Sequence, residues 1–199
     1  MPWLYQLADV HDYKYILNSY KKSSWYTFSV YERINLLRNV AVSLQKYRGD
    51  LIGIGLAEAG KLVKELDAEV SEAVDFANYY AHSMTELLLV NQTTYAQGGI
   101  NLVLSPWNFP IAIPAGGVLA SLVTGNVVVL KPSLNTAACA YVLCQALWEA
   151  GMPKDALYFM PCEENVLDMY LSSGNTFDAV ILTGSTDTAQ FLLKRNPEL

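Results

Sequence analysis

Charge is scarce in this sequence, and its longest gap lies in the middle of the chain. Charged residues make up 16% of the 199 residues, and no Asp, Glu, Lys, Arg or His occurs from Leu87 to Leu130. The formal net charge is −6, and the few basic residues are scattered. Nucleic-acid binding needs clustered Lys and Arg, so the composition argues against a nucleic-acid partner. Hydrophobic residues make up 52%, which predicts a sizeable buried core.

Cysteine is also rare. The three cysteines are Cys139, Cys144 and Cys162, and no pair of them has Cys-x-x-Cys spacing. The histidines, His11 and His82, lie far from them in sequence, so no metal site is expected. The first residues form neither a basic nor an apolar signal-peptide region. Together with the odd number of cysteines, this favours a reducing cytoplasm.

The uncharged stretch raises the alternative of a membrane span. The segment from Ile111 to Leu130 is about as long as a spanning helix. However, Pro114, Gly116-Gly117 and Gly125-Asn126 divide it into short pieces, as turns do in α/β proteins. We therefore favour a buried strand and helix, and expect no transmembrane segment.

The first ninety residues have helical periodicity. From Tyr31, apolar residues recur at helical spacing, and Gly49 is expected to end this helix. Two further helices are expected over Leu51–Ala59 and Val63–Leu89. The sequence thus predicts an N-terminal helical region over residues 1–90 that packs on the remainder of the chain.

After Asn91 short apolar runs alternate with helical segments, which is typical of parallel strands buried on both faces. The prediction is an α/β fold, a Rossmann-like open parallel sheet over residues 91–199. The expected strands cover 100–104, 127–130, 157–160 and 177–182, and the expected helices 111–123, 136–150, 166–171 and 186–194.

Unusual residues follow three of these strands. They are the segments Ser105–Pro110 (SPWNFP), Lys131-Pro132-Ser133 and Thr183–Asp187 (TGSTD). In open parallel sheets ligands bind beyond the carboxyl ends of strands, so these segments are candidates for a shared site. The ordinary dinucleotide fingerprint G-x-G-x-x-G is absent.

In this order and spacing, SPWNFP, GNVVVLKPS and ILTGSTDTA resemble the aldehyde dehydrogenase superfamily. The earlier segments ERINLLRNVAVSLQKYRGDLIGIGLAEAGK and DAEVSEAVDFANYYA resemble its N-terminal helices. The form EAVDFANYYA is most similar to the Δ1-pyrroline-5-carboxylate dehydrogenase branch, which includes the dehydrogenase part of bifunctional proline-utilisation proteins. The resemblance extends from about Leu17 to Lys194.

The resemblance implies an NAD(P)+-dependent enzyme that oxidises an aldehyde to an acid. In the family a cysteine thiolate attacks the aldehyde, and a glutamate-activated water hydrolyses the resulting thioester. Asn108 is the implied catalytic residue in this chain, because its side-chain amide would donate to the oxyanion. Pro106 and Pro110 would stiffen the loop around it. The alternative is that Asn108 satisfies backbone groups of its own loop.

The same resemblance implies that Lys131 and Ser133 contact the cofactor ribose, and that Gly184 and Ser185 bind phosphate at a helix N-terminus. An ordinary solvated lysine and a plain helix cap at Ser185 or Thr186 are the alternatives.

Three residues of the first loop complete the implied cofactor set. Ser105 and Pro106 are taken as part of it, and Trp107 would line the nicotinamide and substrate side. The alternative for Trp107 is a buried structural residue.

The sequence departs from the family pattern in three places. Leu134 stands where many members have a glutamate that holds ribose hydroxyls, so NADP+ remains open beside NAD+. Residues 161–165 (PCEEN) lack the glycines of the usual turn. The ELGGK segment with the general base and the segment with the nucleophilic cysteine do not occur in the 199 residues. None of Cys139, Cys144 and Cys162 matches the nucleophile.

The chain is therefore expected to be a fragment that lacks the catalytic domain and is inactive alone. Its start is also expected to lack strands that usually precede the first helix. The implied substrate is a small aldehyde, glutamate semialdehyde if the branch is right, and the parent is expected to be a homo-oligomer. The alternative is a non-catalytic nucleotide-binding or structural module derived from this fold.

Overall fold

The centre of the molecule is a sheet of four parallel strands, shown in a computed structural model that describes residues 4–90, 98–172, 177–195 and 197. The strand order is β3-β2-β1-β4, so the chain starts in the middle of the sheet and builds outward in both directions. The strands are β1 (Ile100–Leu104), β2 (Val127–Lys131), β3 (Leu157–Phe159) and β4 (Ala179–Leu182).

The pairing register brings the ends of the strands to one edge. Leu104, the last residue of β1, lies opposite Lys131 in β2 and Leu182 in β4. Leu130 lies opposite Phe159, the last residue of β3. Every segment that comes after a strand therefore starts at the same edge of the sheet.

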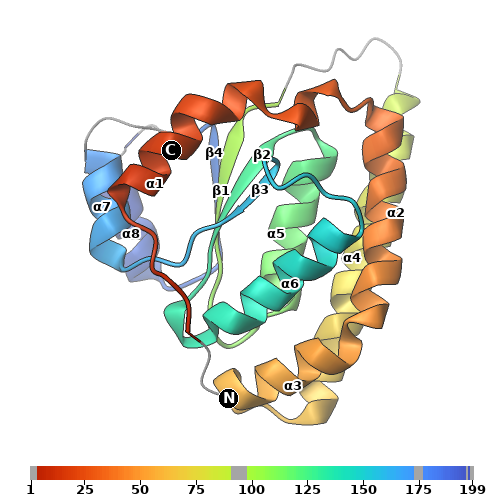
Figure 1. Ribbon diagram of the computed structural model, residues 1–199, viewed down its shortest axis with the longest axis horizontal. Helices are drawn as coiled ribbons and strands as arrows, with labels where there is room; N and C mark the ends of the chain where they lie inside the picture. The colour runs from red at the N-terminus through yellow and green to blue at the C-terminus, as the bar shows by residue number, and fades with distance from the viewer. Residues whose placement is uncertain (1–3, 91–97, 173–176, 196, 198–199) are drawn as a thin grey trace.

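Helices cover both faces of the sheet (Figure 1). One face packs against α2, α4, α5 and α6, and the other against α1, α7 and α8. Short 3₁₀ turns occur at Tyr20–Lys22, Ser24–Thr27 and Leu134–Thr136. The helices are α1 (Val10–Ser19), α2 (Val30–Lys46), α3 (Arg48–Ala59), α4 (Val63–Leu88), α5 (Ala112–Val123), α6 (Ala137–Glu149), α7 (Glu164–Ser172) and α8 (Thr186–Arg195).

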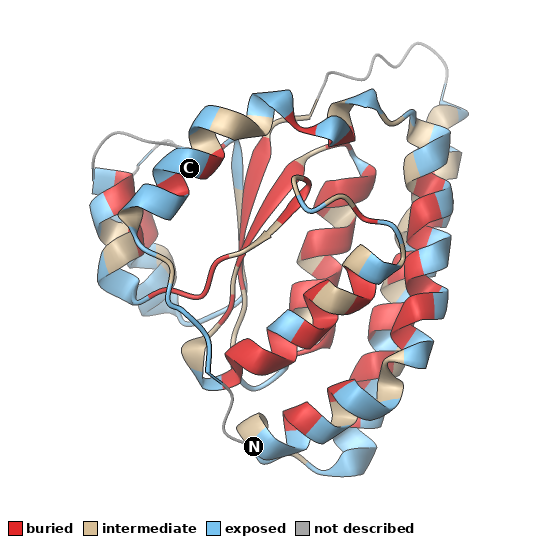
Figure 2. Ribbon diagram, viewed as in Figure 1, coloured by how far each residue is buried: buried red, intermediate tan, exposed pale blue. Residues whose placement is uncertain are grey.

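The three-layer arrangement explains the uncharged stretch. All five residues of β1 are buried, as are four of the five in β2 and most of α5 between them (Figure 2). A charged side chain in these elements would lose its hydration without a partner, and the polar side chain that β1 does bury, Asn101, donates to Ser121 Oγ at 3.1 Å. One core cluster joins residues of α2 and α4 to α5, α6 and the sheet.

Local signals fix where several elements begin and end. Ser29 and Glu32 form a capping box at the start of α2, with Ser29 N–H donating to Glu32 Oε2 at 2.7 Å. Gly125 turns the chain from α5 into β2 with a φ of +92°. A Cβ at this position would lie 2.8 Å from the end of the flexible Arg33 side chain, so the positive φ is the main reason for a glycine here.

The predicted α/β fold with a parallel sheet is confirmed, whereas one expected helix end is wrong. The helix expected from Tyr31 onward was to end at Gly49, but α2 ends at Lys46 and Gly49 lies inside α3. Tyr47 makes the turn between the helices with a φ of −82°, so no left-handed glycine is needed. The boundary between residues 90 and 91 adjoins 91–97, which lie outside the described residues, and stays a prediction.

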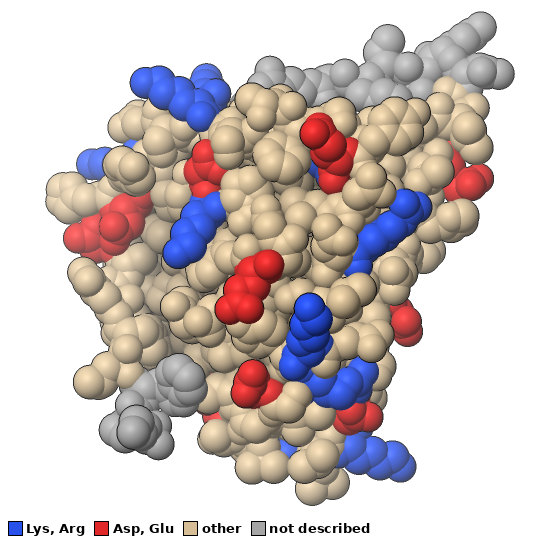
Figure 3. Space-filling model, turned by 45° about the vertical axis from the view of Figure 1, so that its right-hand side comes forward, with Lys and Arg blue, Asp and Glu red and all other residues tan. Residues whose placement is uncertain are grey.

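The membrane alternative over residues 111–130 is wrong, because α5 ends at Val123 and β2 begins at Val127. Within the described part of the chain, no helix combines the length and the hydrophobicity needed to cross a bilayer. On the face shown in Figure 3, basic and acidic side chains are interspersed and form no patch of a single sign.

The packing of α2 gives a direct test of the core. Leu37 is 0% exposed, and Leu37→Ala is expected to lower the free energy of unfolding by about 2–5 kcal/mol, because it leaves a cavity. Val42 is 57% exposed on the same helix, and Val42→Ala is expected to change stability by less than about 0.5 kcal/mol. Urea denaturation followed by circular dichroism measures both, and equal effects would contradict this assignment of the core.

Candidate functional site

The segments that follow β1, β2 and β4 lie side by side at the carboxyl edge of the sheet. Ser105 N–H donates to the carbonyl of Lys131 at 3.4 Å, and Ser133 N–H donates to the carbonyl of Ser105 at 3.2 Å. Thr183 N–H donates to the carbonyl of Leu104 at 3.2 Å. The structure thus brings together the three segments that the sequence singled out.

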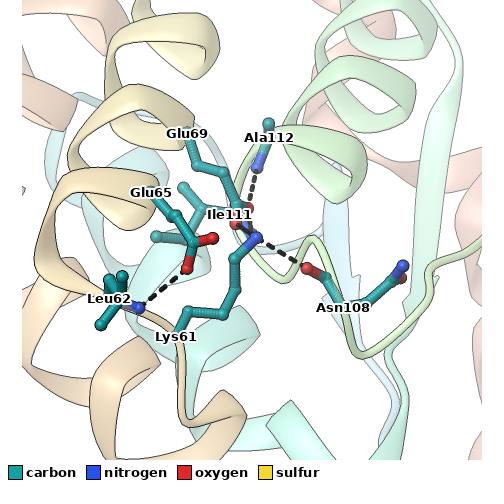
Figure 4. A network of polar contacts seen from close by, with 7 residues as sticks. All are labelled: Lys61, Leu62, Glu65, Glu69, Asn108, Ile111 and Ala112. Atoms are coloured by element: carbon teal, nitrogen blue, oxygen red, sulfur yellow. Dashed lines mark hydrogen bonds and ion pairs between the residues drawn. The ribbon is translucent and has the colours of Figure 1, made fainter.

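The loop from Ser105 to Ile111 is anchored by a buried carboxylate (Figure 4). Glu69, on α4, accepts hydrogen bonds from the backbone N–H groups of Ile111 at 3.0 Å and Ala112 at 3.2 Å. These amides open α5, where a negative charge is favoured by the helix dipole. Lys61 Nζ lies 2.5 Å from the second oxygen of Glu69.

Asn108 is exposed on this loop and is held by its backbone. Lys61 Nζ donates to the carbonyl of Asn108 at 2.7 Å, and the side-chain amide points away from that contact (Figure 4). Among the described residues no hydrogen bond joins the Asn108 side-chain amide to its own loop, and the role of this amide stays a prediction. The amide is free to meet a ligand.

Trp107 lies beside Asn108 and is 53% exposed, so the alternative of a buried structural tryptophan is wrong. Phe109 is 45% exposed, and its ring lies 4.0 Å from Lys61 Nζ in a cation–π contact. Ser105 and Pro106 are half-buried where the loop leaves the sheet. The loop therefore exposes aromatic and amide groups, while the residue that anchors it, Glu69, is buried.

Lys131 and Ser133 are both half-buried at the end of β2. The carbonyl of Leu134 accepts a hydrogen bond from Tyr5 Oη at 3.2 Å. The N-terminus of α6 is capped by Glu58 of α3, which accepts from the N–H groups of Ala138 at 3.1 Å and Cys139 at 2.7 Å. Burial raises the pKa of Glu58, and these two amides partly offset that effect.

Gly184 and Ser185 are exposed at the start of α8. Ser185 Oγ accepts a hydrogen bond from Thr188 N–H at 3.2 Å, so Ser185 caps this helix. The capping alternative is thus realised, and it is compatible with anion binding at the same helix end. The phosphate role of the two residues stays a prediction.

The turn that lacks glycine, after β3, is covered by the N-terminal segment. Ala8 N–H donates to the carbonyl of Pro161 at 2.8 Å, and Tyr13 Oη lies 3.4 Å from Cys162 Sγ. A groove of about 530 Å³ opens beside this turn, and neither Lys131 nor Ser133 lines it. Its walls come from residues 4–8, from the start of α6 and from residues 159–161.

The cysteines and acidic residues offer neither a nucleophile nor a metal site. Cys139, Cys144 and Cys162 are all buried and free, and burial raises the pKa of each thiol. Because the thiolate is the reactive form, these side chains are inert packing residues. No group of three or more His, Cys, Asp or Glu residues that could hold a metal occurs in the described ranges.

The open parallel sheet with helices on both faces places the chain in the class of α/β proteins, in which ligands bind beyond the carboxyl ends of the strands. The profile described as "Aldehyde dehydrogenase family" matches residues 5–198, and the chain belongs to the aldehyde dehydrogenase family. The family expected from the sequence motifs is therefore confirmed.

Relatives in this family include pyrroline-5-carboxylate dehydrogenases. The 1-pyrroline-5-carboxylate dehydrogenase of Staphylococcus aureus (strain MW2) is 35% identical over 199 residues, which cover 94% of this chain and 38% of the relative. The enzyme of the same name from Geobacillus sp. (strain WCH70) is 36% identical over 173 residues, 82% of this chain and 34% of the relative. The chain thus spans about a third of the length of these curated relatives.

Solved structures agree with this placement. The structure of Proline Utilization A (PutA) from Corynebacterium freiburgense matches with a TM-score of 0.92 and 37% identity. The match covers 100% of this chain and 21% of that chain. The whole described fold is therefore that of one part of a much longer solved protein.

Three anchoring residues, Glu69, Lys61 and Glu58, were not identified from the sequence. Glu69 is buried, although it lies among Lys64, Glu65 and Asp67. A signal was present, because Glu69 falls three residues after Leu66, within the buried stripe of α4. No comparable signal marks Glu58, whose partners lie about eighty residues away, or the contact of Lys61 with the Asn108 carbonyl, 47 residues away.

The buried thiols give a testable expectation. In the native protein at pH 8 the three cysteines are expected to react with Ellman's reagent at least about 100-fold more slowly than after unfolding, because burial disfavours the thiolate. Absorbance at 412 nm measures the reaction, and the guanidinium-unfolded protein is the control. One rapidly reacting thiol in the native protein would contradict their assignment as packing residues.

Proposed function

We propose that this chain forms the cofactor-binding part of an NAD(P)+-dependent aldehyde dehydrogenase that oxidises glutamate semialdehyde to glutamate. The supporting observation is the meeting of the Asn108 loop, Lys131-Pro132-Ser133 and Gly184-Ser185 at one edge of the sheet. A dinucleotide is long enough to contact all three segments at once. The substrate is proposed from the names of the relatives, which are pyrroline-5-carboxylate dehydrogenases.

The residues present fit a dinucleotide. Gly184 and Ser185 leave the start of α8 exposed for a phosphate, and Lys131 brings a positive charge to the neighbouring strand end. Ser133 would add a hydroxyl beside the ribose, while Ser105, Pro106 and Trp107 would border the nicotinamide. The carboxylate missing at Leu134 would otherwise repel a 2′-phosphate, so both NAD+ and NADP+ fit the site.

In the proposed reaction Asn108 stabilises the negative charge that develops on the aldehyde oxygen. Its free amide is a donor with a fixed backbone, and such pre-positioned donors stabilise an oxyanion without reorganisation. When bound, NAD(P)+ accepts the hydride from the substrate carbon. Cys139, Cys144 and Cys162 are buried, so the thiolate of the proposed reaction would come from another residue.

One observation favours the second candidate, a non-catalytic nucleotide-binding or structural module. The turn after β3 has Cys162 and two glutamates in place of glycines, and the N-terminal segment packs on it. This restricts how closely a phosphate could approach there. We rank this candidate second because the Asn108 loop keeps its free amide. Association of the whole protein as a homo-oligomer and a cytoplasmic location complete the proposal.

Cofactor binding by the chain itself tests the proposal. Titration calorimetry and thermal denaturation are expected to detect NAD+ binding, with stabilisation at millimolar NAD+. Lys131→Ala is expected to weaken binding at least about tenfold, because it removes a charge-assisted contact. Lys154→Ala, at an exposed position between α6 and β3, is the matched control and is expected to bind as the wild type does.

Absence of heat and of stabilisation with both NAD+ and NADP+ would contradict the proposal. The chain alone is expected to produce no NADH from glutamate semialdehyde, because it lacks a reactive thiol. The whole protein that carries these residues is expected to produce it, and absorbance at 340 nm distinguishes the two. A whole protein that binds NAD+ but oxidises no aldehyde would favour the second candidate.

A further inference from the structure

Lys61 and Glu69 do not belong to the segments that follow the strands, but they hold the loop that follows β1. The Glu69 side chain is 3% exposed and the Lys61 side chain 15%. Glu69 accepts from the N–H groups of Ile111 and Ala112, while Lys61 bridges Glu69 and the carbonyl of Asn108. The pair therefore holds both the middle of the loop and the start of the helix that comes after it.

Lys61 contacts the backbone carbonyl of Asn108 and not its side-chain amide. Lys61 reaches the Asn108 carbonyl from the side of α4, and the Asn108 amide extends in the opposite direction (Figure 4). The Phe109 ring packs on the same ammonium, 4.0 Å from its nitrogen. The peptide of Asn108 is thus held through its carbonyl, on the side opposite its side-chain amide.

We propose that Glu69 and Lys61 are positioning residues for the Asn108 side-chain amide. The inference rests on the proposed function, in which that amide donates to the oxyanion. Loss of the Lys61 contact would release the Asn108 carbonyl while leaving the amide itself chemically intact. The expected effect is therefore on transition-state stabilisation and not on cofactor affinity.

The frame behind the pair is rigid enough to transmit this constraint. Glu69 lies on the buried face of α4, between Leu66 and Ala73, which are both 0% exposed. Pro110 fixes the backbone between the two anchored points. A shift of the loop would break hydrogen bonds to Glu69 that no water could replace at this depth, so the loop has one favoured position.

Steady-state kinetics of the whole protein that carries this chain provide the first test. Lys61→Met is expected to lower kcat for aldehyde oxidation about 10- to 100-fold, because a displaced oxyanion donor loses most of its effect. The KM for NAD+ is expected to change less than about twofold, since the ribose and phosphate contacts are elsewhere.

Arg48→Met is the matched control. Arg48 and Asp67 also form an ion pair between the end of the α2–α3 turn and α4, but it is exposed. It contacts no residue of the 105–112 loop among the described residues. This variant is expected to keep the wild-type kcat. An equal loss in Arg48→Met and Lys61→Met would assign Lys61 a merely structural role and overturn the inference.

A double-mutant cycle tests whether Lys61 acts through Asn108. Asn108→Ala is expected to lower kcat about 10²- to 10³-fold. If Lys61 only positions that amide, Lys61→Met in the Asn108→Ala background is expected to cost less than about twofold more. If the two substitutions lowered kcat multiplicatively in an enzyme that oxidises the aldehyde, this inference would be overturned, but the proposed function would not. An unchanged kcat in Asn108→Ala would instead contradict the proposed function.

A measurement without activity keeps the inference testable on the 199-residue chain. Hydrogen exchange followed by mass spectrometry is expected to show at least about tenfold faster exchange of the 105–112 peptide in Lys61→Met, with no change in Arg48→Met. Unchanged exchange in Lys61→Met would mean that Lys61 does not hold the loop, and would overturn the inference whatever the enzyme does.

Discussion

The geometry of the candidate site depends on one buried carboxylate. Glu69 would be costly in the core without partners, and it is stable there because two backbone amides and the Lys61 ammonium surround it. Removing one partner of such a buried pair typically costs about 3–5 kcal/mol. The loop after β1 therefore cannot move independently of α4, and its conformation is set by a residue far away in sequence.

A second buried helix N-terminus, that of α6 after β2, is also capped by a glutamate. Glu58, near the end of α3, caps α6 as Glu69 caps α5, so carboxylates from both sides of the α3–α4 turn meet two positive helix ends. The segments that carry Asn108 and Lys131 both lead into these helices. The N-terminal helices thus do more than cover the sheet, because they fix the two loops from which a ligand site would be built.

More of the fold than of the site could be predicted from the sequence, because strands and helices leave patterns among neighbouring residues, whereas the site depends on contacts between distant ones. The strand around Val129 and the helix around Leu119 are buried on all sides, and this leaves apolar runs of characteristic length and period in the sequence. The burial of Glu69 left only a weak signal, because one charge within an apolar stripe is not distinguishable from a solvated charge until its partners are known. At Gly49 a local pattern was misleading. Glycine is typical of helix ends, but the chain turns already at Tyr47, so Gly49 lies inside the next helix.

The opposite charges of Lys61 and Glu69 indicate that this pair acts on Asn108 through geometry more than through a net charge. Lys61 alone would place a positive charge beside a developing oxyanion and would stabilise it directly. Because the Glu69 oxygen lies 2.5 Å from the Lys61 nitrogen, the carboxylate opposes the field of the ammonium. The remaining effect is a geometric constraint, a carbonyl held on one side so that the amide on the other side is already oriented. A neutral pair that positions a dipole is thus compatible with an active site in which the amide dipole, and not a nearby cation, meets the negative charge.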